Sequence, residues 1–227
     1  MDACQSAIVL APKDSELQFD LAGVYYHQGR YVEATNICQR AIALFPEEDT
    51  LYIGIGIIHC AQGRYEEAIT AYQQAIRLNP KSAPAHYSFG EVYLKKNKFS
   101  EAELAFRNAL DLSDEQSQYR NIFFFGLGLV NALQNNNDTA LENWQKSLSL
   151  ATDTSPQAQL DRCLVQLALA ASPTIIEEFA TTIQQVQSAK GLLKESLEMA
   201  QLLARCPQPP ADIDQAIALL QAALEQP

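Results

Sequence analysis

The sequence predicts an all-α solenoid, in which antiparallel helix pairs stack one after another. Pro12, Pro46 and Pro80 lie 34 residues apart, and nearly the same eight-residue phrase precedes each of them. A period of about 20–50 residues is typical of stacked repeat proteins. Between successive prolines, apolar residues recur at helical spacing in two separate stretches, which indicates two amphipathic helices in each repeat.

Each repeat is predicted to contain a tight turn between its two helices. In the first repeat, the first helix covers residues 15–28 and the second begins at Tyr31. The turn lies at Gly29, and the equivalent positions are Gly63 and Asn97, residue types that tolerate positive φ. The proline ends the second helix because it cannot continue the hydrogen-bond ladder. Small residues at one position of the second helices should let the paired helices approach closely: Ala34, Ala68 and Ala102.

This pattern resembles that of the tetratricopeptide repeat family, in which Trp-x2-Leu-Gly-x2-Tyr precedes Ala-x3-Phe and a final proline. The second repeat carries the pattern at Tyr52, Ile55, Gly56, His59, Ala68, Tyr72, Ala75 and Pro80. The third carries it at His86, Phe89, Gly90, Tyr93, Ala102, Phe106 and Ala109. The fourth carries it at Phe124, Leu127, Gly128, Asn131, Ala140, Trp144 and Leu148. The resemblance extends from Ser15 to Leu150 and implies a right-handed superhelical solenoid.

We expect the chain to divide into six segments. These are the second helix of an incomplete repeat (1–14), four repeats (15–48, 49–82, 83–120 and 121–154), and degenerate helical repeats with a C-terminal cap (155–227). The third repeat has a four-residue insertion near Ser117, about one helical turn, which is expected to lengthen a helix. Beyond Leu150 we expect helices near 156–171, 173–190, 192–206 and 212–225, with Gly191 ending the second of them.

The N-terminal segment lacks the first helix of its repeat. Either the chain begins with a half-repeat cap, or it has been cut from a longer protein. A cap should have a polar outer face, whereas this segment is rich in apolar residues: Ala3, Ala7, Ile8 and Val9. We therefore favour the second alternative, and we expect self-association through this end because two uncovered apolar edges can cover each other.

Composition excludes several classes of function. The net charge of −11 and the pI near 4.7 have the wrong sign for binding nucleic acid. No apolar stretch reaches about 18 residues, so membrane insertion is not expected. The cysteines form no Cys-x-x-Cys pair, which argues against disulfides and a zinc site and favours a reducing, cytoplasmic setting. They are Cys4, Cys38, Cys60, Cys163 and Cys206.

Motifs for catalysis or cofactor binding are missing as well. Two Gly-x-Gly pairs, at 54–56 and 126–128, lack the third glycine and the preceding strand of a dinucleotide fingerprint. We interpret them as sites of close helix packing. The histidines His27, His59 and His86 are scattered, and no serine lies in a Gly-x-Ser-x-Gly elbow. The sequence therefore predicts no enzyme, no catalytic or metal-binding residue and no cofactor.

The family resemblance implies that the first helices line a concave groove and that their exposed positions contact a peptide. The corresponding residues are Phe19, Tyr26, Ile53, Ile57, Tyr87, Glu91, Leu94, Phe125, Leu129 and Leu133. This is an apolar stripe with one carboxylate, larger than a soluble monomer usually leaves uncovered. Family members that bind chaperone C-termini use a clamp of lysine, asparagine and arginine. At those positions this chain has Phe19, Gly23, Gly54, Pro84 and Ser88, so a chaperone-tail adaptor is disfavoured.

Two hypotheses follow for the groove. In the first, the chain is a protein-protein interaction scaffold whose groove binds an apolar or amphipathic helical segment of a protein or peptide partner. In the second, the chain is a structural module within a larger protein or assembly, and its own helix Leu192–Cys206 fills the groove.

Overall fold

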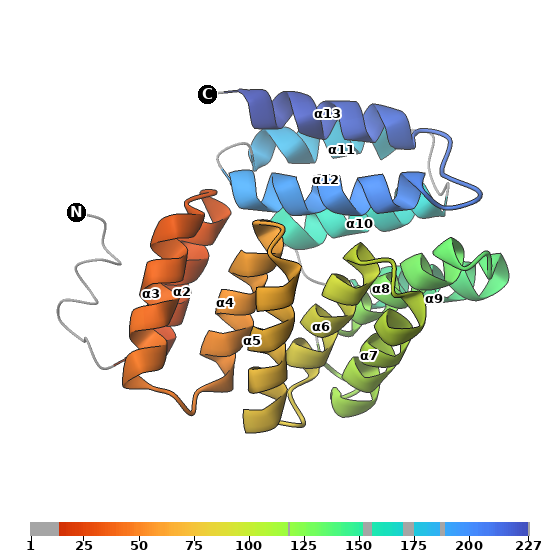
Figure 1. The fold of residues 1–227 in the computed structure, drawn as a ribbon. Helices are drawn as coiled ribbons and strands as arrows, with labels where there is room; N and C mark the ends of the chain where they lie inside the picture. Colours follow the sequence, from red (N-terminus) through yellow and green to blue (C-terminus); the bar gives the residue numbers. More distant parts are fainter. Residues whose placement is uncertain (1–13, 118, 152–155, 170–174, 187–188, 227) are drawn as a thin grey trace.

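The structure is a computed structural model that describes residues 14–117, 119–151, 156–169, 175–186 and 189–226. The regular secondary structure of these residues is entirely α-helical (Figure 1). The repeat region contains α2 (Ser15–His27), α3 (Tyr31–Leu44), α4 (Asp49–Ala61), α5 (Tyr65–Leu78), α6 (Ala83–Lys95), α7 (Phe99–Leu112), α8 (Arg120–Leu133) and α9 (Asn137–Leu150). It is followed by α10 (Pro156–Ala168), α11 (Ile175–Gln185), α12 (Lys190–Ala204) and α13 (Ile213–Glu225). The expected half-repeat at 2–12, and with it the expected self-association surface, lies outside the described residues.

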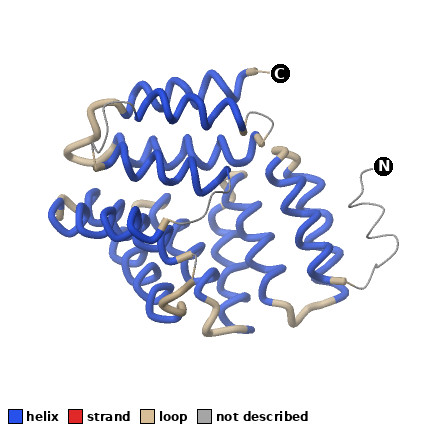
Figure 2. The backbone as a smooth tube through the Cα atoms, turned by 180° about the vertical axis from the view of Figure 1, so that it is seen from behind, coloured by secondary structure: helices blue, strands red, loops and turns tan. Residues whose placement is uncertain are grey.

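Helices α2 to α9 form four antiparallel pairs that stack side by side, as the repeat pattern predicts (Figures 1 and 2). The turns inside the first three pairs have positive φ at the expected residues: +74° at Gly29, +75° at Gly63 and +59° at Asn97. The fourth pair uses Asn135, with φ of +65°. The same turn conformation therefore recurs in every pair and keeps the pairs in register.

Small residues hold the two helices of each pair together. Ala34, Ala68 and Ala102 are fully buried, as expected from their position in the repeat. A Cβ atom placed on Gly56 would lie 2.4 Å from the ring of Tyr72, so only glycine lets that ring pack against the backbone of α4. This confirms that the glycines of the two Gly-x-Gly pairs, at 54–56 and 126–128, serve close helix packing.

Three of the four inserted residues lengthen a connection and one lies in α8, which has 14 residues where α6 has 13, so our expectation that the insertion adds a turn to a helix is wrong. Residues 113–119 join α7 to α8, whereas residues 79–82 make the equivalent connection between α5 and α6. Helix α7 has 14 residues, the same as α5. The Asp114 side chain accepts a hydrogen bond from a backbone N–H two residues on, which favours a turn over continued helix. Arg120 then donates to Ser113 and closes the loop.

The C-terminal helices form near the expected positions, but Gly191 does not end a helix. Helix α11 stops at Gln185, and Gly191 lies in the first turn of α12. A Cβ atom on Gly191 would lie 2.5 Å from the carbonyl oxygen of Tyr26 and 2.8 Å from Cα of His27. The glycine is therefore needed for the approach of α12 to the backbone of α2, and not for chain termination.

Helices α10 to α13 form a second layer across one end of the repeat helices (Figures 1 and 2). Helix α12 contacts both α2 and α8, so it spans the row of first helices. The largest apolar core runs through both layers and includes Phe106, Leu129, Leu164, Leu193 and Leu220, each of which is fully buried. None of the helices in the described part of the chain combines the length and the apolar character that crossing a lipid bilayer requires.

Candidate functional site

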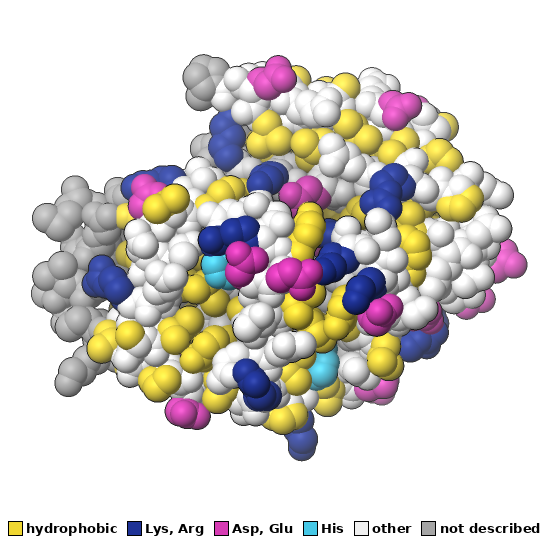
Figure 3. All heavy atoms as spheres, in the orientation of Figure 1, with side chains coloured by type: hydrophobic (Ala, Val, Ile, Leu, Met, Phe, Trp, Pro, Cys, Tyr) yellow, Lys and Arg dark blue, Asp and Glu magenta, His cyan; other side chains and the backbone are white. Residues whose placement is uncertain are grey.

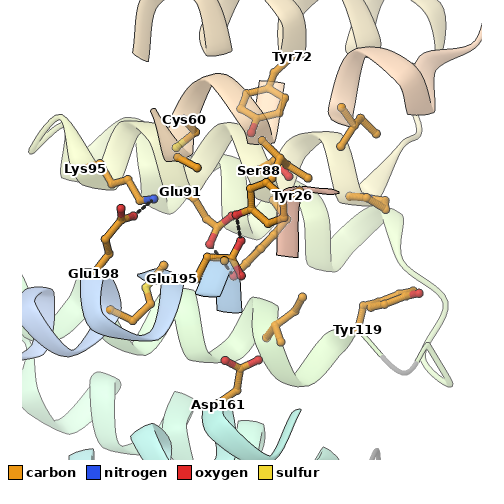
Figure 4. A pocket seen from close by; sticks show the side chains of 18 of the residues that line it. Tyr26, Cys60, Tyr72, Ser88, Glu91, Lys95, Tyr119, Asp161, Glu195 and Glu198 are labelled. Carbon is orange, nitrogen blue, oxygen red and sulfur yellow. Dashed lines mark hydrogen bonds and ion pairs between the residues drawn. The ribbon is translucent and has the colours of Figure 1, made fainter. Parts of the chain in front are cut away.

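A cavity of about 530 Å³ lies between the first helices of the repeats and α12 (Figure 4). This volume falls in the range of about 300–1,000 Å³ that is usual for ligand sites. Most of its wall is apolar or aromatic, and its polar side chains come chiefly from α6 and α12. Residues that line it include Phe19, Tyr26, Ile53, Ile57, Tyr72, Tyr87, Ser88, Glu91, Lys95, Tyr119, Phe123, Phe125, Asp161, Lys194, Glu195, Ser196, Glu198 and Met199.

The structure brings most of the groove residues expected from the sequence to this one cavity. Seven of the ten line it: Phe19, Tyr26, Ile53, Ile57, Tyr87, Glu91 and Phe125. Leu94 and Leu129 lie instead in the apolar core, with exposed fractions of 1% and 0%, and Leu133 packs partly buried against that core. All three belong to, or pack against, the apolar core that runs through both layers.

Sequence reasoning missed the contribution of α12 to the cavity. Lys194, Glu195 and Glu198 lie outside the repeat pattern, and charged residues at such spacing are typical of a solvated helix face. The one signal that could have found this face is Gly191, which stands one turn before Glu195. Asp161 on α10 was missed for the same reason.

Polar contacts fix α12 across the C-terminal ends of the first helices. The ammonium group of Lys194 donates to the carbonyl of Ala61, the last residue of α4. This places a cation at the negative end of the helix dipole. Arg205, just past the end of α12, donates to the side chain of Asn97 in the turn after α6. Helix α12 therefore runs from α2 past α4 to α6 and covers the cavity.

Three further hydrogen bonds lie at the cavity wall (Figure 4). The hydroxyl of Tyr26 on α2 donates to the Glu195 carboxylate on α12. Lys95 on α6 forms an ion pair with Glu198 on α12, with 2.5 Å between Nζ and Oε2. The Tyr87 hydroxyl donates to Glu91 one turn further along α6, at 3.1 Å. Two of these three contacts join the repeat layer to the C-terminal layer.

Burial changes the acid strength of the cavity carboxyls. Burial raises the pKa of Glu91 to about 7, although the charge of Lys95 counteracts part of the effect. The pKa of Glu195 is also raised by burial, against the hydrogen bond from Tyr26. Both carboxyls therefore ionise less readily than an exposed glutamate, even with the charge of Lys95 nearby.

Lys95 behaves in the opposite way. Burial alone lowers its pKa, but the neighbouring Cys60, Glu198 and Glu91 groups raise it by more, so the pKa lies above its ordinary value. The side chain therefore stays an ammonium cation, already engaged by Glu198.

Family models match most of the repeat region. A model described as "TPR repeat" matches residues 56–97, and one described as "Tetratricopeptide repeat" matches 3–49 and 89–153. The chain belongs to the tetratricopeptide repeat family. A search of curated proteins finds no match to this tetratricopeptide repeat chain.

Solved structures of other tetratricopeptide repeat proteins share the fold. The chain is similar to PilF of Pseudomonas aeruginosa, with 17% identity over 93% of this chain and 90% of that one and a TM-score of 0.57. It is similar to PilW, a type IV pilus biogenesis factor, with 19% identity over 93% and 92% and a TM-score of 0.58. YrrB matches with 18% identity over 88% and 98% and a TM-score of 0.51. At these identities the similarity concerns the fold alone.

The tetratricopeptide repeat cavity carries no clamp for a peptide carboxylate at the positions where some family members have one. Phe19, Pro84 and Ser88 occupy such positions on the cavity wall. A Cβ atom on Gly54 would lie 3.0 Å from the ring of Phe19, which leaves little room there for a longer side chain. The cavity is therefore unlike a site for an acidic chain end.

The cysteine and acidic residues of this tetratricopeptide repeat chain do not form a metal site within the described residues. Cys38, Cys60, Cys163 and Cys206 are free and buried. Burial raises the pKa of Cys38 to about 12 and that of Cys60 to about 11, so both remain thiols at neutral pH. Neither has the thiolate character that a nucleophile needs.

Proposed function

We propose that this chain is a non-catalytic protein-interaction module that takes an apolar or amphipathic segment of a partner protein into its concave cavity. The observation that carries the proposal is the open volume of about 530 Å³ beneath α12, lined by apolar residues such as Phe19, Ile53 and Ile57. Apolar walls with a few polar groups are typical of binding sites. Membership of a family of interaction repeats supports the proposal, and one structural neighbour, YrrB, is a TPR protein with an unusual peptide-binding site.

The size of the cavity limits how a partner helix would bind. A helix with its side chains is about 10–12 Å across, so it would not pass whole beneath α12. Anchoring side chains from one face, at positions i, i+3 or i+4, and i+7, would enter the cavity while the helix backbone stays outside. Partner specificity would then depend on the few side chains that reach the cavity floor.

A second candidate function is a structural module within a larger assembly, with α12 as the natural occupant of the groove. The contacts of α12 with Tyr26, Ala61 and Lys95 favour it, since they join α12 to three successive repeats. Under this hypothesis the cavity would bind no partner, and the contacts of the module would lie on its outer surface.

The test compares two charge substitutions. Ile57 is half-buried on the cavity wall, and Val32 is 67% exposed on α3. A carboxylate at Ile57 would place a polar group on an apolar wall that a partner must cover, which is unfavourable. We expect Val32→Glu to retain the partners that the wild-type chain captures from native lysate, and Ile57→Glu to lose them while the chain remains folded. Equal capture by both variants would contradict the proposal and favour the structural module.

A further inference from the structure

Two carboxylates on the cavity wall have tyrosine hydroxyls as their hydrogen-bond donors. Glu195 on α12 accepts from Tyr26, and Glu91 on α6 accepts from Tyr87. Among the ion pairs that the described residues form, neither Glu91 nor Glu195 takes part. Figure 4 shows the two side chains on facing elements, with Tyr26 beside them. A buried carboxylate is costly unless it is paired with a cation or protonated.

The cavity as a whole has an excess of acidic groups. Its wall carries the carboxyls of Glu91, Glu195 and Glu198, together with Asp161, which already has a partner, and the ammonium groups of Lys95 and Lys194. Lys95 is paired with Glu198, and Lys194 donates to a backbone carbonyl. The net charge of the chain is −11, and on the face of Figure 3 acidic and basic side chains lie beside each other. Burial raises the pKa of Glu91 and Glu195, so a cation that enters the cavity beside them favours their ionised forms.

The aromatic walls fit the same type of ligand. Tyr26, Tyr72, Tyr87 and Phe123 line the cavity beside the carboxylates. Aromatic faces attract cations, and long basic side chains bury their aliphatic stems against apolar surface while the charged end finds a polar partner. A bare divalent ion is less suited, because the described residues provide no group of three or more metal-ligating side chains.

We propose that the cavity recognises a basic side chain of a partner peptide, an arginine or a lysine, whose cation lies between Glu91 and Glu195 and whose stem contacts the aromatic wall. This rests on the proposed function, since it requires a partner segment to enter the cavity. In addition, the partner side chain that enters the cavity is cationic, and apolar residues flank it in the partner peptide.

Protonation of Glu91 makes cation binding measurable as the release of a proton. Because burial raises its pKa to about 7, a bound cation drives the carboxyl to ionise and release a proton near neutral pH. Proton release on binding should therefore be largest just below pH 7 and smaller at pH 8. The titratable groups that act on Glu91 are Tyr87 and Lys95 on α6, Tyr26 on α2, Cys60 on α4, Tyr72 on α5, and Glu195 and Glu198 on α12, while Asp161 on α10 acts on Tyr87.

The experiment is calorimetric titration of the full chain with blocked peptides, acetyl-Leu-Arg-Leu-amide and its citrulline analogue, which has the same shape without the charge. We expect the arginine peptide to bind about tenfold tighter at pH 8. The double variant Glu91→Gln, Glu195→Gln should remove this preference, because glutamine keeps the hydrogen-bond acceptors and loses both charges. Glu142→Gln, on the exposed face of α9, is the matched control and should retain the preference.

The possible results separate this inference from the proposed function. Equal binding of the arginine and citrulline peptides would overturn the cationic anchor and leave an apolar binding site standing. Binding of free propylguanidine as tightly as the arginine peptide would overturn the role of a partner side chain. If no peptide binds, the inference fails, while the Ile57→Glu comparison still decides the proposed function. Unequal proton release in wild type and double variant, measured in two buffers, supports the inference even if the double variant is less stable.

Discussion

The repeat layer and the C-terminal layer are both helical, but different kinds of contact build them. From α2 to α9, each helix packs on its neighbours in the chain, and the same small residues and turns recur in each pair. Helix α12 instead depends on contacts with residues far away in the chain, such as the hydrogen bond between Tyr26 and Glu195, 169 residues apart. The first kind of contact repeats and can be recognised in a sequence, whereas the second kind occurs once.

The cavity exists only where the two layers meet. The repeats provide its apolar wall, and α12 provides the carboxylate of Glu195 and the cover that buries Glu91. Removing either layer would leave an open groove or an isolated helix. Experiments that disturb one layer and spare the other therefore test the comparison directly.

The largest expected effect concerns Glu91, which is half-buried on the cavity wall beneath α12. Its pKa of about 7 in the folded chain lies above the ordinary 4.5, so the folded state binds the proton more tightly than the unfolded state. This contribution to stability is present below pH 4.5 and is lost as pH rises through 7. The stability of Glu91→Gln relative to wild type should therefore rise by about 3 kcal/mol between pH 4.5 and pH 8.

Denaturant unfolding at several pH values measures this difference. Glu142→Gln, which removes a charge from the exposed face of α9, is the control for charge alone. A flat difference between Glu91→Gln and wild type would mean that Glu91 is solvated, and hence that α12 leaves the groove open.

A glycine at the junction of the layers should be nearly as sensitive. Gly191→Ala would place Cβ 2.5 Å from the Tyr26 carbonyl oxygen, and such a clash with backbone should destabilise the chain by about 1–3 kcal/mol. Gly23→Ala is the control, since no atom lies within 4 Å of its Cβ position in α2. That change should stabilise by about 0.5–1 kcal/mol. Thermal unfolding of both variants measures these changes in stability. If Gly191→Ala and Gly23→Ala change the melting temperature equally, α12 does not pack against α2.

The sequence could predict the repeat layer almost residue by residue because one repeat explains the next. Gly29, Gly63 and Asn97 were expected at positive φ on that ground, and the fourth turn at Asn135 follows the same rule. The cavity residues that lie within repeats could be predicted in the same way, because equivalent positions of successive repeats face the same side.

The C-terminal layer could be predicted only as a set of helices. A glycine that ends a helix and a glycine that admits a neighbouring backbone look alike in a sequence, which is why the interpretation of Gly191 was wrong. Glu195 likewise resembles any solvated helical carboxylate until α2 is placed beside it. The insertion before α8 was misjudged because the turn at Asp114 depends on a side-chain hydrogen bond and not on spacing.

Two alanine-to-leucine substitutions, one in each layer, compare how tightly the layers are packed. Ala68 is fully buried between α4 and α5, whereas Ala180 is half-buried on α11. Ala68→Leu should destabilise by about 1–3 kcal/mol, and Ala180→Leu by less than about 1 kcal/mol. Equal costs in denaturant unfolding would show that α11 packs like a regular repeat helix.

The smallest expected effect is the coupling across the layers through Lys95 and Glu198. Their side chains are 12% and 27% exposed, so the pair should show a coupling energy of about 1 kcal/mol in a double-mutant cycle. The surface pair Arg107 and Glu103, within α7, should couple by only about 0.3–0.5 kcal/mol. A cross-layer coupling no larger than the surface one would indicate that Lys95 and Glu198 are solvated.

The most direct measurement of the central claim, that α12 covers the concave face beside α2, is a nuclear Overhauser effect between Gly191 and His27 in the intact chain. The Cβ position of Gly191 lies 2.8 Å from Cα of His27, so a strong cross-peak between their α protons is predicted, together with slow amide exchange in α12. Absence of the cross-peak, with amides of α12 exchanging as fast as those of an isolated helix, would contradict the account.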